Sequence, residues 1–379
     1  MKVLVNATTL VKGGGIQVAA SFIAESCRDD MGIAWHYAIS PQVAEELASL
    51  GVDPSAVTLF TASPTRDKVQ RQQLYALEKR LQPDVVFSVF GPAYTKFRSP
   101  HLCGVAVGWV THSTRLAFAA LPNWLARAKT FLTCVYKGFW LRYADRWVVE
   151  AESARDGMRR RIGVSPDNVD IVENSCAAVF NAADLAPSRC PDSGEVLRLV
   201  YVSAYYPHKN IEFIPAVAEA LRRKAPDQDL EFIVTLPDDE SGLQRLLADA
   251  AARGVSDCIR NAGRVSLRQI IELYRDAHLC YMPSLLETFS ATYPEAMALG
   301  RPIVTNDLDF AHANCGNAAV FAAPNDADAH ADAILGLLRS SSDWDACIER
   351  GRARLAELPD ARRKYELYVQ AIRATAAEM

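Results

Sequence analysis

Two glutamates eight residues apart, Glu287 and Glu295, carry the clearest chemical signal in the chain. The apolar run over 278–282 predicts a buried strand, and the residues over 292–299 predict a helix that Gly300 ends. Glu287 therefore falls in the loop after a strand, and Glu295 falls on the helix that follows. The backbone N–H groups at the start of a helix bind anions, so the segment offers an anion site with one carboxylate before it and one after it in the chain.

These groups match the parts of an activated sugar. The Glu287 carboxylate can accept hydrogen bonds from sugar hydroxyls. The N–H groups near Ser290, Ala291 and Thr292 can neutralise a diphosphate. The Glu295 carboxylate can hold the two vicinal hydroxyls of a ribose, because its two oxygens accept side by side.

The segment from Pro283 to Val304 resembles the donor-binding segment of the family 4 retaining glycosyltransferases, which have the GT-B fold. Their signature is a pair of glutamates separated by seven residues within a fixed frame. A bare pair is common by chance, whereas the framed pair is specific, and an ordinary surface helix would not explain its strand-loop-helix setting. The matching frame residues here are Pro283, Ser284, Phe289, Ala296, Met297, Ala298, Gly300 and Pro302.

A second segment, Tyr201 to Asn210, resembles the first strand and loop of the family's donor domain. Lys209 matches the lysine of that motif, and the resemblance implies that it is the cation facing the leaving diphosphate. Ala204 stands where the family has an arginine, so one phosphate-binding cation is missing. The candidates to replace it are Arg264, Arg268 and His208.

The resemblance implies further contacts to the donor. Arg264 and Val265, which follow Gly263, are implied to contact the base. His112 is implied to face the donor sugar. The histidines expected to be structural are His36, His101, His278, His312 and His330. Gly14 and Gly15 belong to a glycine-rich loop that lines the cleft in the family, although three glycines alone predict only a flexible turn.

Strands alternating with helices along most of the chain predict an α/β protein with two doubly wound, Rossmann-like parallel sheets and a cleft between the domains. With 379 residues, two domains are expected. We expect an acceptor domain over 1–175, a linker over 176–196 and a donor domain over 197–360. A last helix over 361–379 is expected, and packing back on the N-terminal domain is one arrangement open to it.

Five apolar runs predict strands in the N-terminal half before residue 146. Continuous apolar runs are typical of parallel strands, which are buried on both faces. The predicted strands cover 3–5, 34–39, 57–60, 84–89 and 104–110.

Charge is concentrated in residues 96–161, which carry 12 basic and four acidic residues with aromatic residues between them. Trp and Tyr beside Lys and Arg suit the headgroup layer of an anionic membrane, and residues 124–161 are the candidate surface. A solvated basic face whose aromatic residues point into the core explains the pattern equally well, and docking of an anionic substrate is a third possibility.

Composition excludes several classes of protein. The formal net charge of −4 argues against a nucleic-acid partner. The nine cysteines form no CxxC pair, which argues against a zinc site and a disulfide framework. The N-terminus has no signal-peptide pattern and the chain no apolar run of membrane-spanning length, so we expect a cytoplasmic protein that either is freely dissolved or lies on the inner face of the membrane.

The resemblance implies transfer of a sugar from a nucleotide-diphosphate donor with retention of anomeric configuration. A glycan or lipid-diphosphate-linked glycan is the expected acceptor, in synthesis of a surface polysaccharide such as O-antigen or capsule. The donor is a substrate, and no cofactor or metal is expected. Asp307-Leu308-Asp309 spells a DxD motif, but its place after a strand predicts a turn.

Three alternatives belong to other classes. A nucleotide-sugar epimerase of related two-domain fold would form an epimer without an acceptor. A non-enzymatic sugar-binding protein would have no need for a lysine beside the anion site. A Rossmann dehydrogenase is disfavoured, because Gly13–Gly15 lacks the third glycine of the fingerprint and Ser40, not an acidic residue, follows the second strand.

Overall fold

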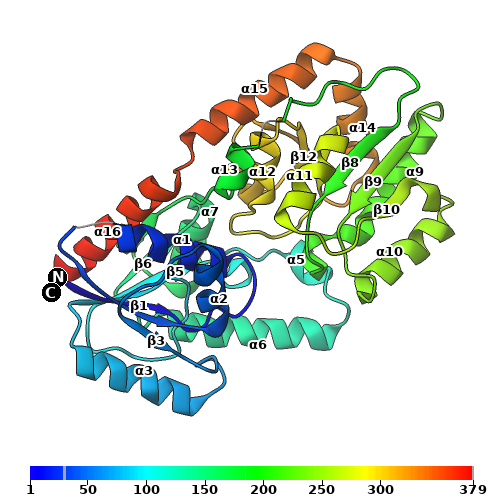
Figure 1. Ribbon diagram of the computed structural model, residues 1–379. Coiled ribbons are helices and arrows are strands. Elements are labelled where there is room, and N and C mark those ends of the chain that lie inside the picture. Colours follow the sequence, from blue (N-terminus) through cyan, green and yellow to red (C-terminus); the bar gives the residue numbers. More distant parts are fainter. Residues whose placement is uncertain (29–30, 184, 378–379) are drawn as a thin grey trace. The chain divides into compact units, whose positions relative to one another are not determined.

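The chain folds into two compact units, shown in Figure 1 as a computed structural model that describes residues 1–28, 31–183 and 185–377. The first unit contains residues 1–112, 128–174 and 359–379, and the second contains 113–127 and 175–358. Residues 113–127, which the sequence analysis counted with the N-terminal domain, thus group with the second unit. Each unit is built on its own parallel sheet, which confirms the predicted pair of Rossmann-like domains.

The first unit has a seven-stranded sheet in the order β3-β2-β1-β4-β5-β6-β7, with every pair of neighbours parallel. Its central strands are apolar because helices cover both faces: Val3 and Val5 pack in one cluster, while Leu4 and Val86 pack in another on the opposite face. The strands are β1 (Lys2–Ala7), β2 (Ala34–Ile39), β3 (Val57–Leu59), β4 (Val85–Ser88), β5 (His101–Val105), β6 (Arg146–Val149) and β7 (Val169–Ile171).

The helices of this unit include the last one in the chain. Helix α16 packs on α1, where the ring of Phe22 lies 5.3 Å from that of Tyr365 and 5.8 Å from that of Tyr368. The C-terminal helix is therefore part of the first unit. The helices are α1 (Gly15–Arg28), α2 (Pro41–Ser49), α3 (Lys68–Leu81), α4 (Gly108–Thr111), α6 (Trp124–Leu141, whose first turn groups with the second unit), α7 (Glu152–Gly157), the π-helical turn η1 (Met158–Ile162) and α16 (Ala361–Ala377).

The second unit has a six-stranded parallel sheet in the order β10-β9-β8-β11-β12-β13. The strands are β8 (Leu197–Tyr201), β9 (Leu230–Val234), β10 (Ile259–Asn261), β11 (Leu279–Met282), β12 (Ile303–Asn306) and β13 (Ala319–Ala322). The helices are α5 (Arg115–Ala119), α8 (Ala178–Asn181), α9 (Ile214–Lys224), α10 (Ser241–Ala252), α11 (Leu267–Asp276), α12 (Thr292–Ala298), α13 (Asp309–Cys315), α14 (Ala327–Leu338) and α15 (Ser341–Glu357).

The segment expected to be a linker packs against the second unit. Phe180 on α8 is fully buried in the core of that unit. The backbone N–H of Ser188 donates to the carbonyl of Gly300 at 2.9 Å, and the Arg301 guanidinium donates to the carbonyl of Ala186 at 3.0 Å. These contacts fix the segment beside the end of α12.

One predicted strand is wrong over most of its length. The run over 104–110 was expected to be extended, but β5 ends at Val105 and α4 begins at Gly108. A short apolar run does not distinguish a strand from a buried helical turn, and Val110 is buried in either conformation. Among the described residues, no helix has the length and apolarity needed to cross a membrane.

Candidate functional site

The loop between β11 and α12, which carries Glu287, is held in place by buried polar side chains. Asn306, at the end of β12, donates from Nδ2 to the carbonyls of Pro283 at 2.7 Å and Ser284 at 2.9 Å. His330 Nε2 lies 3.0 Å from the Asn306 Oδ1 atom and fixes the orientation of the amide. The Ser284 hydroxyl lies 2.7 Å from that of Tyr201 on β8. The loop is thus tied to β12 and β8, and His330 on α14 supports the contact with β12.

Glu287 and Lys209 meet at the carboxyl ends of β11 and β8. The Lys209 ammonium lies 2.5 Å from the Glu287 carboxylate, and the two side chains are only 15% and 10% exposed. Burial lowers the pKa of Lys209, but the charge of Glu287, the hydrogen bond to it and the nearby Tyr201 and Tyr206 together outweigh burial, so the pKa is raised. The raised pKa keeps the Lys209 ammonium charged. The structure thus brings Lys209 and Glu287 together, and their roles toward a donor stay a prediction.

The backbone keeps Lys209 beside the loop. Lys209 ends a single 3₁₀ turn, Pro207–Lys209, that follows β8. The backbone N–H of Leu285 donates to the carbonyl of His208 at 2.7 Å, and the Tyr201 hydroxyl donates to that of Lys209 at 3.3 Å. The turn and the Glu287 loop therefore form one hydrogen-bonded unit.

Glu295 lies in the first turn of α12, largely buried. Burial raises the pKa of its carboxyl to about 7, although the positive charge of Lys209 acts in the opposite direction. Within the described residues, the carboxylate accepts no hydrogen bond and joins no ion pair. A buried carboxylate without a protein partner is poised to accept hydrogen bonds from a ligand.

The start of α12 offers backbone N–H groups. The backbone N–H groups of Ser290, Ala291 and Thr292 donate no hydrogen bond to an acceptor within residues 1–28, 31–183 and 185–377. The Thr292 hydroxyl donates to the carbonyl of Val202 at 3.3 Å, which anchors the helix start to the loop after β8. Helix α12 has only seven residues, so the individual N–H groups, more than a long helix dipole, would attract an anion.

The candidates to replace the missing arginine differ in charge and exposure. Burial lowers the pKa of His208 to about 4, and the nearby Glu287 charge only partly offsets this, so His208 is neutral at pH 7. Arg264 and Arg268 are exposed, and neither makes an ion pair in the part of the chain described. Val265 is half-buried beside Arg264. The exposed arginines are therefore the available cations.

The remaining predicted residues lie in the first unit. His112 caps the end of α4, and its Nδ1 atom lies 2.7 Å from the Thr111 hydroxyl. In the glycine loop, Gly13 has the positive φ of 81° that favours glycine, whereas Gly14 has open space and Gly15 is crowded by Leu10. Because these residues and Glu287 belong to different units, their joint action stays a prediction.

Sequence reasoning missed Asn306 and treated His330 only as structural. His330 is fully buried between Asn306 and the Tyr281 hydroxyl, which confirms that structural role. Asn306 could have been noticed as a polar residue closing an apolar strand. Its partners, however, are backbone carbonyls 22 and 23 residues away, which no sequence pattern identifies.

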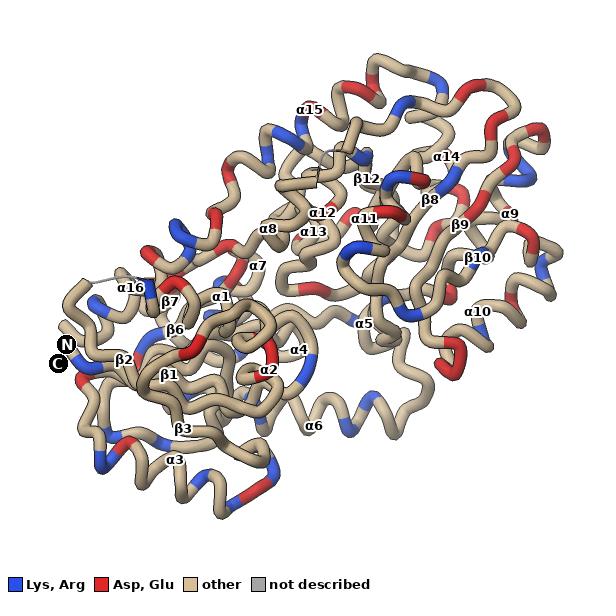
Figure 2. Tube along the Cα trace, viewed as in Figure 1, with Lys and Arg blue, Asp and Glu red and all other residues tan. Residues whose placement is uncertain are grey.

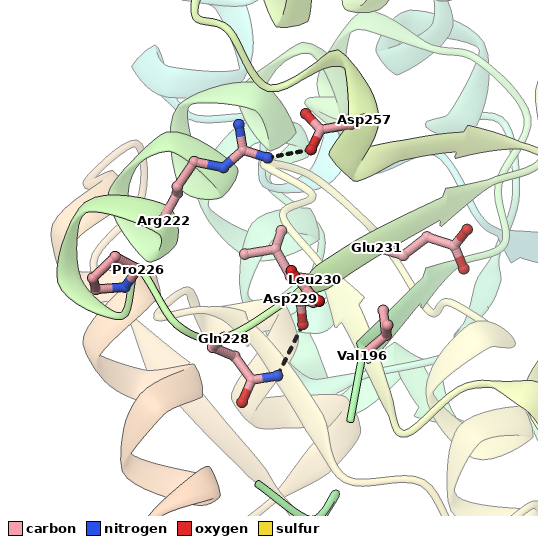
Figure 3. A pocket seen from close by; sticks show the side chains of 8 residues that line it. All are labelled: Val196, Arg222, Pro226, Gln228, Asp229, Leu230, Glu231 and Asp257. Atoms are coloured by element: carbon pink, nitrogen blue, oxygen red, sulfur yellow. Dashed lines mark hydrogen bonds and ion pairs between the residues drawn. The ribbon is translucent and has the colours of Figure 1, made fainter. Parts of the chain in front are cut away.

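A pocket at the amino edge of the second sheet is a different site. It lies beside the start of β9, where Asp229 and Leu230 line it (Figure 3). Arg222 is the one cation that lines it and is paired with Asp257 at 2.5 Å, while Asp229 and Glu231 add negative charge. Such a lining would repel a diphosphate, so this pocket is not the donor site.

The chain is similar to known proteins in two ways. Residues 197–340 match the family model described as "Glycosyl transferases group 1". A D-inositol 3-phosphate glycosyltransferase of Nocardia farcinica is 28% identical over 173 residues, covering 44% of this chain and 38% of that protein. An O-antigen chain mannosyltransferase of Salmonella typhimurium is 22% identical over 217 residues, covering 57% of this chain and 52% of that protein. The match thus spans about half or less of these curated relatives.

Solved structures resemble the whole chain. A glycosyltransferase from Rickettsia africae superimposes with a TM-score of 0.73 at 15% identity, covering 100% of this chain and 99% of that one. The Anabaena protein HepE, solved with UDP and glucose, gives a TM-score of 0.70 at 14% identity and covers 99% and 100% of the two chains. At these identities the likeness shows the fold, which is the expected GT-B fold of two Rossmann-like domains.

Proposed function

We propose that this chain, whose residues 197–340 match the family model "Glycosyl transferases group 1" and which has the GT-B fold, is a retaining glycosyltransferase with a nucleoside-diphosphate sugar as donor. One observation carries the proposal. The buried Lys209–Glu287 ion pair lies in the same matched segment as Glu295, a largely buried carboxylate with no protein partner in the described residues. The Lys209 cation suits the diphosphate of the donor, and the carboxylates of Glu287 and Glu295 suit the hydroxyls of the sugar and of the ribose.

Each side chain has one task in the proposed complex. The Glu295 carboxylate accepts hydrogen bonds from the two ribose hydroxyls. The Lys209 ammonium, which is paired with Glu287, also forms an ion pair with the diphosphate. Glu287 accepts from hydroxyls of the transferred sugar, and His112 and the Gly14–Gly15 backbone approach that sugar from the first unit.

The chemical step breaks the bond between the anomeric carbon and the diphosphate oxygen, and forms a bond from that carbon to the acceptor oxygen on the same face. The diphosphate gains negative charge as its bond breaks, and it takes up the proton that the acceptor hydroxyl loses. Lys209 and the N–H groups of Ser290, Ala291 and Thr292 stabilise that charge without reorganising. Arg264 supplies the further cation, and Val265 packs on the base.

The reaction is proposed to be independent of metals and of any cofactor. The charge of the leaving diphosphate is met by Lys209 and backbone N–H groups, which removes the need for a divalent cation. The Asp307 carboxylate of the DxD-like sequence is engaged with His312 at 2.6 Å, which supports the structural role expected for it.

The acceptor and location are proposals as well. A glycan or lipid-diphosphate-linked glycan in surface polysaccharide synthesis agrees with the Salmonella relative, whose name describes an O-antigen mannosyltransferase. Such acceptors are held at the inner face of the cytoplasmic membrane, and we place the protein there.

The experiment has two arms. A thermal-shift screen of UDP, GDP, ADP and dTDP identifies the base, because a ligand that binds the folded state raises Tm. Incubation of the matching nucleotide sugars with acceptor extracts, followed by NMR of the product, then reports the anomeric configuration. A new glycosidic bond of the donor's configuration supports the proposal. An epimerised donor formed without acceptor, or an inverted product, would refute it.

A further inference from the structure

Helix α6 exposes a continuous apolar stripe. Seven of the seventeen large apolar side chains that are exposed within the described residues lie on this helix. Scattered single residues of this kind are normal, whereas a cluster marks an interaction surface. Five of the seven belong to the first unit and define what we call the α6 stripe: Phe131 (59% exposed), Leu132 (66%), Val135 (56%), Tyr136 (45%) and Phe139 (51%).

The spacing puts these five side chains on one side of the helix. At 3.6 residues per turn they fall within an arc of about 140°. Leu141 is the one residue of α6 that is buried. The stripe is therefore turned away from the core, and the interpretation in which these aromatic residues point inward is wrong for Phe131, Tyr136 and Phe139.

Cations accompany the stripe. Helix α6 contains no acidic residue, and Figure 2 shows blue but no red segments along it. The exposed Lys129 lies at the edge of the arc. The Lys96 ammonium lies 5.4 Å from the ring of Tyr143, which contacts Phe139 at 5.2 Å.

A further cation lies near the same edge of the arc as Lys129. The ring of Tyr136 stacks on that of Tyr94 at 5.8 Å, and the Arg71 guanidinium lies 5.8 Å from the Tyr94 ring. The apolar stripe is thus bordered by positive charge. This combination matches a layer that is apolar inside and negatively charged at its surface.

We propose that the α6 stripe inserts into the headgroup region of an anionic lipid bilayer. The proposal rests on the membrane location proposed above, and it names the surface and the lipid charge. Phe131, Val135 and Phe139 enter the boundary of the acyl chains. Tyr136 stays at the headgroup level, and Lys129 meets lipid phosphates.

A second copy of the chain fits this surface less well than lipid does. Pairing two α6 stripes would bring basic residues of both copies to one interface, and the helix has no acidic residue to compensate. Anionic lipid supplies both the apolar layer and the opposite charge.

The test measures flotation of the full chain with vesicles of phosphatidylcholine alone and with 30% phosphatidylglycerol added. The Phe131→Ser/Phe139→Ser double variant should bind the anionic vesicles on the order of 100-fold more weakly, since two aromatic side chains no longer leave water. Lys129→Gln should weaken binding about fivefold. A matched control, Val69→Ser/Leu247→Ser, removes two exposed apolar side chains from α3 and α10 and should bind like the parent chain.

Three results would overturn the proposal: no binding of the parent chain, equal loss in the control, or equal binding to both vesicle types. A concentration-dependent dimer in sedimentation that the double variant abolishes, without vesicle binding, would assign the stripe to a second copy. The Tm shift caused by nucleoside diphosphates separates this test from the proposed function. A double variant that keeps that shift is folded, vesicle binding without any shift refutes the donor site, and a shift without vesicle binding refutes only the membrane surface.

Discussion

Replacing Glu295 with glutamine should stabilise the protein at alkaline pH while it weakens donor binding. The carboxyl of Glu295 has its pKa raised from 4.5 to about 7, because burial disfavours its charged form. A raised carboxyl pKa means that stability is greatest below the unfolded value of 4.5. Stability is then lost as the pH rises through 7, where the folded protein must ionise a buried group.

The size of the effect follows from the shift. A pKa difference of about 2.5 units, at about 1.4 kcal/mol per unit, lowers the free energy of unfolding by about 3 kcal/mol at pH 8. Glutamine is uncharged at every pH, so the variant does not lose this free energy of unfolding. For a unit of this size, the Glu295→Gln variant should raise Tm on the order of 6 °C at pH 8 and change it little at pH 5.

The assay is thermal unfolding at pH 5 and pH 8, with Glu45→Gln on α2 as a matched control because Glu45 is exposed. A second readout is the affinity for the nucleoside diphosphate. Protonation of Glu295 removes an acceptor for the ribose hydroxyls, so the parent chain should bind about tenfold more weakly at pH 6 than at pH 8. A Tm gain that is equal at both pH values, or a loss at pH 8, would refute the reasoning.

Three further outcomes are expected. Lys209→Ala breaks the buried pair with Glu287 and should cost about 3 kcal/mol of stability and lower kcat about 100-fold, whereas a rise in KM with unchanged kcat would contradict the role of the cation in the chemical step. Asn306→Ala removes the hydrogen bonds to Pro283 and Ser284, so Tm should fall by an amount equivalent to about 2 kcal/mol and donor KM should rise; an unchanged KM would show that the loop is held by other contacts. Activity should survive EDTA, and a loss that magnesium restores would refute metal independence.

The sequence predicts most of what positions the proposed donor site. The framed glutamate pair and Lys209 are local patterns that follow predicted strands, and parallel strands bring their carboxyl ends to one edge. That rule places Glu287 and Lys209 together before any coordinates are known. The structure adds that the two side chains are paired and largely buried.

Other features depend on contacts that are distant in sequence. The strand predicted over 104–110 is wrong because apolar content alone does not distinguish a short helical turn from a strand. Strand β7, with Asp170 at its centre, was missed because the polar residue interrupts the apolar run. The orientation of α6 was undecided, because a membrane surface and a solvated basic face with inward-pointing aromatic residues explain its composition equally well.

The central claim is that Lys209, Glu287 and Glu295 grip the parts of one nucleoside-diphosphate sugar, and calorimetric titration of the parent chain and two variants tests it most directly. The parent chain should bind the diphosphate more tightly than the nucleoside. Lys209→Ala should lose that preference but keep its affinity for the nucleoside, and Glu295→Gln should weaken both ligands alike. If both variants bind the two ligands as the parent chain does, these residues do not form the donor site.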